Sequence, residues 1–207
     1  MTAKNANALN PITPMKPADL ADIQAEAASQ LATNNNKLLL TLWLVVEAGL
    51  FACLIYANFS VRFAQGQWPP QGVDRLSMGL PLALTAILLI SSFTAIRGVA
   101  ALKRGDPTAF GRFFIGTIAL GIVFAIGVFS LLSKVPYHGV YDAMFFTLWI
   151  VHVAHAIVVL GFLGYVGWRG THGGYTADRV FPVEAATYLW HFLDIMWIVL
   201  FLVLYIV

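Results

Sequence analysis

The stretch RFFIGTIALGIVFAIGVFSLLSK, from Arg112 to Lys134, carries no charged residue between its two ends. A helix of about 20 apolar residues crosses the hydrocarbon core of a bilayer, at a rise of about 1.5 Å per residue. An amphipathic helix of a soluble protein would show a charged face in a window of this length. The stretch therefore predicts a membrane-spanning helix.

Four other stretches of the chain are similarly apolar and contain few charged residues. Together they predict five spans, at residues 38–60, 78–101, 112–133, 142–168 and 183–207. Lipid offers no hydrogen-bond partner to the backbone, so a spanning segment satisfies its own backbone groups as a helix. We expect an all-α integral membrane protein with a bundle of five transmembrane helices.

The composition of the whole chain agrees with this fold class. The chain is 59% hydrophobic and 11% charged, with a mean hydropathy of +0.79, whereas a soluble domain is about 45–50% apolar and about 25% charged. The net charge of +2 is too small for a surface that follows nucleic-acid phosphates, so we expect no nucleic-acid partner. The single cysteine, Cys53, excludes a disulfide framework and a cysteine-cluster metal site.

The polar segment 1–37 lacks the apolar core of a signal peptide. It predicts a cytoplasmic tail, partly disordered, ahead of a single membrane domain at residues 38–207. Within the tail, Ala18–Leu31 has the composition of a short surface helix, and we expect the run Asn34–Asn36 to end that helix before the first span.

The Lys and Arg residues of the loops are unevenly divided between the two sides of the predicted membrane domain. The side of the N-terminus carries nine of the 12: Lys4, Lys16, Lys37, Arg97, Lys103, Arg104, Arg112, Arg169 and Arg179. Because cytoplasmic loops are enriched in Lys and Arg, the N-terminus is expected in the cytoplasm and the C-terminus outside.

Two charged residues, Glu47 and Asp194, fall deep inside predicted spans, where a charge is costly and points to function. Glu47 lies ~14 Å from the inner surface, and Asp194 and His155 have a similar depth. His152 and His191 lie close to this depth. Two alternatives are open for this set. Its members pair across helices or with a neighbouring subunit, or each one bonds a nearby backbone or side chain and holds the bundle together.

Span five carries a polar stripe, because Glu184, Thr187, His191 and Asp194 recur at intervals of three and four residues. A haem between His191 and one of the two span-four histidines is an alternative, as is a Zn or Cu site that adds Asp194. A proton-coupled transporter using Glu47 and Asp194 is disfavoured, because the chain lacks matching halves with interrupted helices. No motif of a catalytic site is present.

The glycines Gly161, Gly164 and Gly167 recur every three residues near the end of span four. Small residues let membrane helices approach closely. This spacing predicts a helix–helix contact along the glycines.

The last span, VEAATYLWHFLDIMWIVLFLVLY from Val183 to Tyr205, resembles the last helix of subunit III of haem–copper oxidases. That family has an acidic residue at the helix start, then a Trp-His-Phe-x-Asp core followed by a tryptophan. The matching residues here are Glu184, Trp190, His191, Phe192, Asp194 and Trp197.

Other spans support the same resemblance. Gly79–Thr94 is similar to the family's Leu-Pro-led helix that ends in a serine pair, and Glu47 has the position of the acidic residue in the first common helix. His152 and His155 match a His-x-x-His pair, although the family usually has a glycine between them. This departure leaves open a nitric-oxide-reductase-type accessory subunit of the same fold.

The resemblance implies a non-catalytic accessory subunit of a respiratory cytochrome c or quinol oxidase, in the short five-helix form. It implies that the chain carries no cofactor or metal, that haem and copper lie in subunits I and II, and that the chain packs mainly on subunit I. Bound phospholipid, support of proton uptake, enzyme stability and a bacterial inner-membrane location are also implied. The expected lipid, proton or inter-helix contacts are Glu47, His152, His155, Glu184, Trp190, His191 and Asp194.

Overall fold

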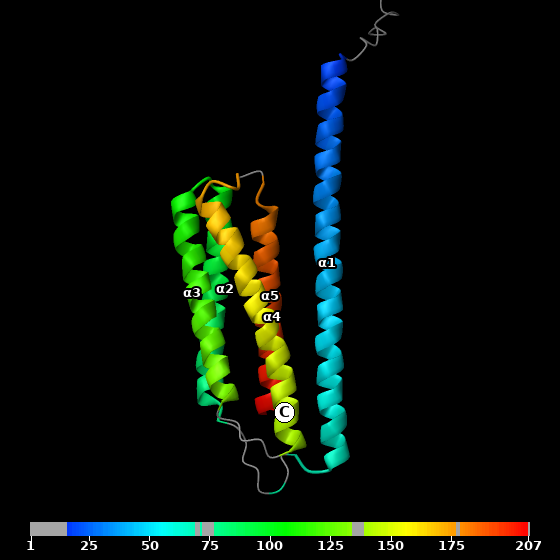
Figure 1. Ribbon diagram of the computed structural model, residues 1–207, viewed down its shortest axis with the longest axis vertical. Coiled ribbons are helices and arrows are strands. Elements are labelled where there is room, and N and C mark those ends of the chain that lie inside the picture. The colour runs from blue at the N-terminus through cyan, green and yellow to red at the C-terminus, as the bar shows by residue number, and fades with distance from the viewer. Residues whose placement is uncertain (1–15, 69–70, 72–76, 134–138, 177–178, 207) are drawn as a thin grey trace, which may run out of the picture. The chain divides into compact units, whose positions relative to one another are not determined.

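The computed structural model of the chain describes residues 16–68, 71, 77–133, 139–176 and 179–206. Its described part consists of helices and their connections, which confirms the predicted all-α fold, and five helices are long and apolar enough to cross a membrane. The elements are α1 (Pro17–Gln65), α2 (Gly79–Lys103), α3 (Pro107–Leu132), α4 (Val140–Thr171), α5 (Phe181–Phe201) and the π-helix η1 (Leu202–Ile206) (Figure 1). By its internal contacts the chain divides into two units, Met1–Thr41 and Leu42–Val207.

Helix α1 is unbroken over 49 residues, so the predicted break at Asn34–Asn36 is wrong. An asparagine inside a helix costs only about 0.7 kcal/mol relative to alanine. Alanines and leucines on both sides of the run propagate the helix through it. Pro17 begins the helix, in the first turn, where a missing backbone N–H is tolerated. The rest of the tail before Lys16 lies outside the described residues.

Helices α2 to α5 pack as a bundle in which α2 contacts α3 and α5, while α4 contacts α3 and α5 (Figure 1). The part of α1 from Leu42 onward reaches the bundle through Phe51, which is fully buried. The Phe51 ring lies 5.5 Å from the ring of His155 and 6.3 Å from that of Phe192. Helices α1, α4 and α5 therefore share one aromatic contact.

The turn between α2 and α3 shows why the chain reverses direction there. Gly105 has a φ of +72°, which favours glycine. Asp106 then caps α3 by accepting a hydrogen bond from the backbone N–H of Ala109 at 2.9 Å, and Pro107 begins the helix. This tight turn holds α2 and α3 side by side.

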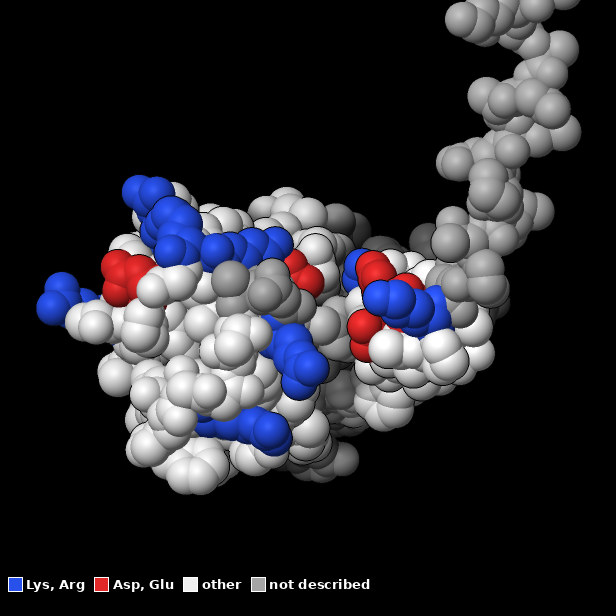
Figure 2. All heavy atoms as spheres, turned by 90° about the horizontal axis from the view of Figure 1, so that it is seen from above, with Lys and Arg blue, Asp and Glu red and all other residues white. Residues whose placement is uncertain are grey.

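Exposed basic side chains gather at the end of the bundle where α2 and α4 finish and α3 and α5 begin (Figure 2). They are Lys103, Arg104, Arg112, Arg169 and Arg179. The sequence had assigned these residues to one side, and the topology brings them to one end. Which side of a membrane this end faces stays a prediction.

Within this chain, the predicted close contact along the span-four glycines occurs at one of the three positions. A Cβ atom built at Gly161 or Gly164 meets no heavy atom within 4 Å, whereas at Gly167 it lies 2.9 Å from Phe114 Cδ1. Tighter approaches occur at Gly170 of α4, where a built Cβ meets Phe110 Cε1, and at Gly121 of α3, where it lies 2.5 Å from Leu160 Cδ2. The α3–α4 contact therefore depends on glycines of both helices.

Candidate functional site

Glu47 of α1 and His155 of α4 form a pair across two helices, with His155 Nε2 lying 2.9 Å from Glu47 Oε2. His155 Nδ1 lies 2.6 Å from the carbonyl oxygen of Val151 and donates to it, because a carbonyl oxygen only accepts. Glu47 Oε2 is buried and has no hydrogen bond of good geometry among the described residues, so its contact with His155 is an ion-pair distance. A proton on either Nε2 or Oε2 leaves the pair with no net charge, which suits a membrane interior.

An apolar groove of about 580 Å³ adjoins this pair. Its lining comes from α1, α4 and α5: Trp43, Glu47, Ala154, His155, Val158, Val159, Phe162 and Leu189. Glu47 and His155 are the polar members of the lining, and their side chains are only 13% and 28% exposed. The groove therefore offers hydrocarbon walls beside one neutral polar pair.

His152, the other histidine of α4, has different surroundings. It is 1% exposed, and its ring lies 6.2 Å from Phe51, 6.2 Å from Phe124 and 5.6 Å from Trp197. Its Nδ1 has no hydrogen-bond partner among the described residues. His152 thus packs inside an aromatic cluster of four helices, apart from the groove.

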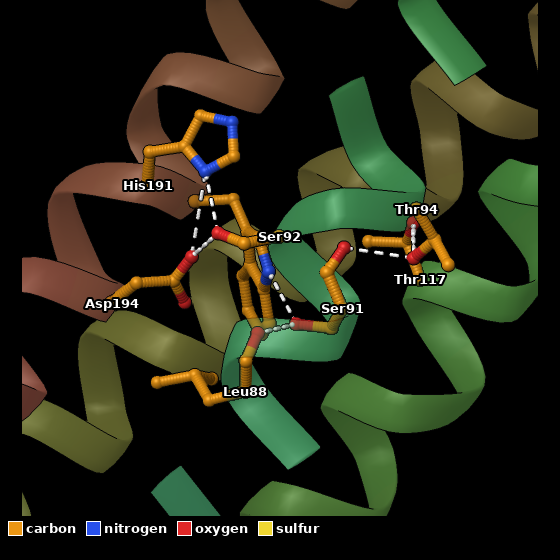
Figure 3. A network of polar contacts seen from close by, with 8 residues as sticks. Leu88, Ser91, Ser92, Thr94, Thr117, His191 and Asp194 are labelled. Atoms are coloured by element: carbon orange, nitrogen blue, oxygen red, sulfur yellow. Dashed lines mark hydrogen bonds and ion pairs between the residues drawn. The ribbon is translucent and has the colours of Figure 1, made fainter. Parts of the chain in front are cut away.

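A second polar cluster joins α5 to α2 (Figure 3). The hydroxyl of Ser92 donates to Asp194 Oδ2, and its oxygen lies 2.7 Å from His191 Nδ1. His191 Nδ1 also lies 3.4 Å from Asp194 Oδ2. The other ring nitrogen, Nε2, is buried and has no partner among the described residues.

Two indole N–H groups of α5 also bond hydroxyls of α2. Trp190 Nε1 donates to Ser91 Oγ at 3.0 Å, and Trp197 Nε1 donates to Thr85 Oγ1 at 2.9 Å (Figure 3 draws the first of these). The Ser91 hydroxyl in turn donates to the carbonyl of Leu88 at 2.7 Å. These bonds satisfy buried indoles that lipid would leave unpaired.

The polar stripe of α5 lies against α2. Glu184 Oε1 lies 2.6 Å from Lys103 Nζ, while the buried Thr187 hydroxyl donates to the carbonyl of Val183 at 2.9 Å. Beside them is a groove of about 400 Å³. Its lining residues are Ile96, Val99, Ala100, Lys103, Glu184, Thr187, Tyr188 and His191.

Comparison with known proteins places this geometry in a family. The family model for "Cytochrome c oxidase subunit III" matches residues 21–207. The chain belongs to the cytochrome c oxidase subunit III family. The resemblance read from the last span is therefore confirmed, and this subunit III is part of a multi-subunit oxidase complex.

Curated relatives agree with the family assignment. "Cytochrome c oxidase subunit 3" of Synechocystis is 33% identical over 168 residues, covering 79% of this chain and 72% of the relative. The protein of the same name from Corynebacterium diphtheriae is 33% identical over 168 residues, covering 78% and 81%. "Probable cytochrome c oxidase subunit 3" of Mycobacterium leprae is 31% identical over 170 residues, covering 79% and 83%. Like these bacterial relatives, the chain is a multi-pass integral membrane protein of a bacterial membrane.

In this subunit III the predicted polar band resolves into two separate clusters. Glu47 pairs with His155, and Asp194 pairs with His191 through Ser92, so the structure does not bring the two acidic residues together. Each cluster contains a contact between helices and a contact within one helix, so the choice between the two alternatives stays a prediction. Sequence reasoning missed the hydroxyl partners on α2, for which the only signal was a set of Ser and Thr residues inside an apolar span.

The metal and haem alternatives do not fit the side chains of this subunit III. Within the described ranges, no group of three His, Cys, Asp or Glu side chains converges as a metal site requires. His152 is enclosed by aromatic rings, whereas His191 bonds Ser92 on α2. His152 and His191 therefore lie in separate surroundings.

Proposed function

We propose that the chain is a cofactor-free accessory subunit of a respiratory haem–copper oxidase, packing on catalytic subunit I near subunit II. In this proposal it binds structural phospholipid, supports proton uptake and stabilises the enzyme during oxygen reduction. The observation that carries the proposal is the neutral Glu47–His155 pair in the wall of an apolar groove.

The groove suits a phospholipid acyl chain. The two nitrogens of His155 lie 2.6 Å from the Val151 carbonyl oxygen and 2.9 Å from Glu47 Oε2, so the pair is held within the chain. The remaining walls are apolar side chains, including Val158, Phe162 and Leu189. A lipid chain in contact with such walls keeps its dispersion contacts and leaves no polar group unpaired.

The same pair supports the role in proton uptake. Nε2 and Oε2 of the pair lie 2.9 Å apart, and a proton on either atom leaves the pair neutral overall. A proton can therefore move between the two atoms without placing a net charge at membrane depth. In this proposal the pair stabilises the part of the complex that takes up protons. Lipid in the groove keeps water away from the pair.

The orientation belongs to the same proposal. The basic end of the bundle, with Lys103, Arg104 and Arg169, faces the cytoplasm of a bacterial inner membrane (Figure 2). The N-terminus is then cytoplasmic and the C-terminus periplasmic. Haem and copper reside in subunits I and II.

Replacing Glu47 tests this function in the purified complex. We expect Glu47→Ala to leave the haem content intact, to reduce the phospholipid that co-purifies per haem, and to speed inactivation during turnover. Glu26→Ala is the matched control, because Glu26 is an exposed carboxylate of the same helix and is not among the residues that line the groove. Phospholipid is counted by mass spectrometry, and activity is followed as oxygen consumption until it stops.

Two results would contradict the proposal. Unchanged lipid content and unchanged turnover lifetime in Glu47→Ala would show that the groove does not bind the phospholipid that stabilises the enzyme. A complex that carries this chain and reduces nitric oxide but not oxygen would assign it to the nitric-oxide-reductase type.

A further inference from the structure

We propose that the part of α1 that precedes its apolar span, residues 17–37, docks an amphipathic helix of another protein. The partner helix presents an apolar row with Lys or Arg side chains beside it, and the contact lies outside the hydrocarbon core of the membrane. This inference goes beyond the proposed function and does not depend on it, because it uses none of the residues that line the α1–α4 groove.

Helix α1 is longer than a bilayer requires. Its 49 residues are ~74 Å long, whereas a hydrocarbon core is about 30 Å thick. The apolar run of α1 begins at Leu38, so residues 17–37 continue the same unbroken helix for ~31 Å on one side of the membrane (Figure 1). We call this segment the α1 extension. Its residues are exposed along its whole length.

One face of the α1 extension carries a row of apolar side chains. Leu20, Ile23, Ala27 and Leu31 recur at intervals of three and four residues, the spacing that places side chains on one face of a helix. The Leu20, Ile23 and Leu31 side chains are 46%, 52% and 63% exposed. A contiguous apolar row outside the hydrocarbon core indicates a contact surface.

A polar residue within this row favours a protein helix as the occupant. Asn34 lies three residues after Leu31 and four before Leu38, so it belongs to the same row. A single asparagine in the apolar row of a helix pair fixes the register of the two helices. An acyl chain offers no hydrogen-bond partner to the Asn34 amide, whereas a facing helix can offer one.

Charge disfavours the membrane surface as the occupant. Asp19, Asp22 and Glu26 recur beside the apolar row, also at intervals of three and four, and no Lys or Arg occurs from residue 17 to residue 36. Helices that lie on a bilayer surface carry Lys and Arg on their polar face, because the lipid surface is negative. The α1 extension has the opposite charge.

The same charges disfavour a second copy of the chain. A copy would bring three more carboxylates and no basic side chain within residues 17–36, so the acidic row would stay uncompensated. In helix pairs, the residues that flank the apolar row select the partner by charge. Basic side chains beside the partner's apolar row would supply the missing charge opposite Asp22 and Glu26.

Photo-crosslinking tests the proposed face in membranes of cells that produce the full chain in its oxidase complex. A benzophenone amino acid replaces Ile23 or Leu31 in separate variants. Matched controls carry it at Ala25 or Ser29, which are exposed on the opposite face of the same helix. We expect adducts with another protein from Ile23 and Leu31 and not from the controls, with Lys or Arg in the crosslinked peptide.

Charge reversal separates this contact from incidental capture. We expect the double substitution Asp22→Lys and Glu26→Lys to lower the adduct yield at Ile23 by about three- to tenfold, the effect of losing a small network of exposed charge pairs. Changing the crosslinked peptide's Lys or Arg to Glu should restore the yield. The control Ala25→Lys and Ser29→Lys adds positive charge to the opposite face and should leave the yield unchanged.

Several results would overturn the inference. Adducts between two copies of the chain would assign the apolar row to a homodimer, and adducts with lipid alone would assign it to the membrane surface. Equal yields from the row and control positions, no adduct from Ile23 or Leu31, or a yield that charge reversal does not change would also overturn it. None of these results bears on the proposed function, which the Glu47→Ala complex tests separately.

Discussion

Gly121 of α3 is a position where adding one methyl group has a definite structural consequence. A Cβ atom built there lies 2.5 Å from Leu160 Cδ2 and 2.9 Å from Trp190 Cη2. Trp190 cannot withdraw freely, because it is 1% exposed and its Nε1 donates to the Ser91 hydroxyl at 3.0 Å. We therefore predict that Gly121→Ala destabilises the bundle.

The magnitude follows from two opposing contributions to the free energy of unfolding. Alanine is favoured over glycine inside a helix by about 0.5–1 kcal/mol. Forcing a methyl group into a packed interior costs about 1–3 kcal/mol. The expected net loss for Gly121→Ala is about 1–2 kcal/mol. At Gly161 the built Cβ meets nothing within 4 Å. Gly161→Ala should therefore raise the free energy of unfolding by the helix-propensity contribution alone, about 0.5–1 kcal/mol.

The assay is unfolding of the purified chain in mixed micelles by increasing sodium dodecyl sulfate, followed by tryptophan fluorescence. The two alanine variants share the same chemical change on neighbouring helices, so their difference isolates packing. We expect their unfolding free energies to differ by about 2 kcal/mol. A Gly121→Ala chain as stable as Gly161→Ala would refute the packing argument at α3.

Three further outcomes are expected. Trp197→Phe removes an indole N–H bond and should lower the unfolding free energy by about 0.6–1.7 kcal/mol, whereas Trp168→Phe, at a 62% exposed position, should be neutral in the same titration. Ser92→Ala breaks the link between His191 and Asp194 and should destabilise the chain, and a stability equal to that of the parent would refute the role of Ser92. Continuous helix through Asn34–Asn36 should slow amide hydrogen exchange there to the level of the flanking residues, and unprotected amides would contradict it.

The membrane fold could be predicted because its signal is local. Each span is a window nearly free of charge, such as residues 113–133, and its length matches the thickness of a bilayer. The break at Asn34–Asn36 was predicted wrongly from the same kind of local signal. Three residues of modest helix propensity are a weak effect, and helix formation on both sides overrides it.

The site could be predicted only in part. The depth of Glu47 and Asp194 marked them as internal contacts, because a charge that faces lipid is costly. Their actual partners are a histidine of α4 and a serine of α2, and the bond from Ser92 to His191 joins residues 99 positions apart. A hydroxyl carries no charge, so the sequence did not indicate that Ser92, inside an apolar span, bonds these side chains.

The amino-acid sequence alone determined that the chain crosses a membrane five times, where its few ionisable groups lie along the spans, and which family motif closes the last helix. Only the tertiary structure decided which helix face meets which neighbour. The physical reason is that a membrane helix is apolar on the face toward lipid as well as on the face toward the bundle, so its 3.6-residue period does not reveal its rotation. That rotation brought Glu47 of α1 to His155 of α4 and His191 of α5 to Ser92 of α2, so that the two polar clusters line different grooves.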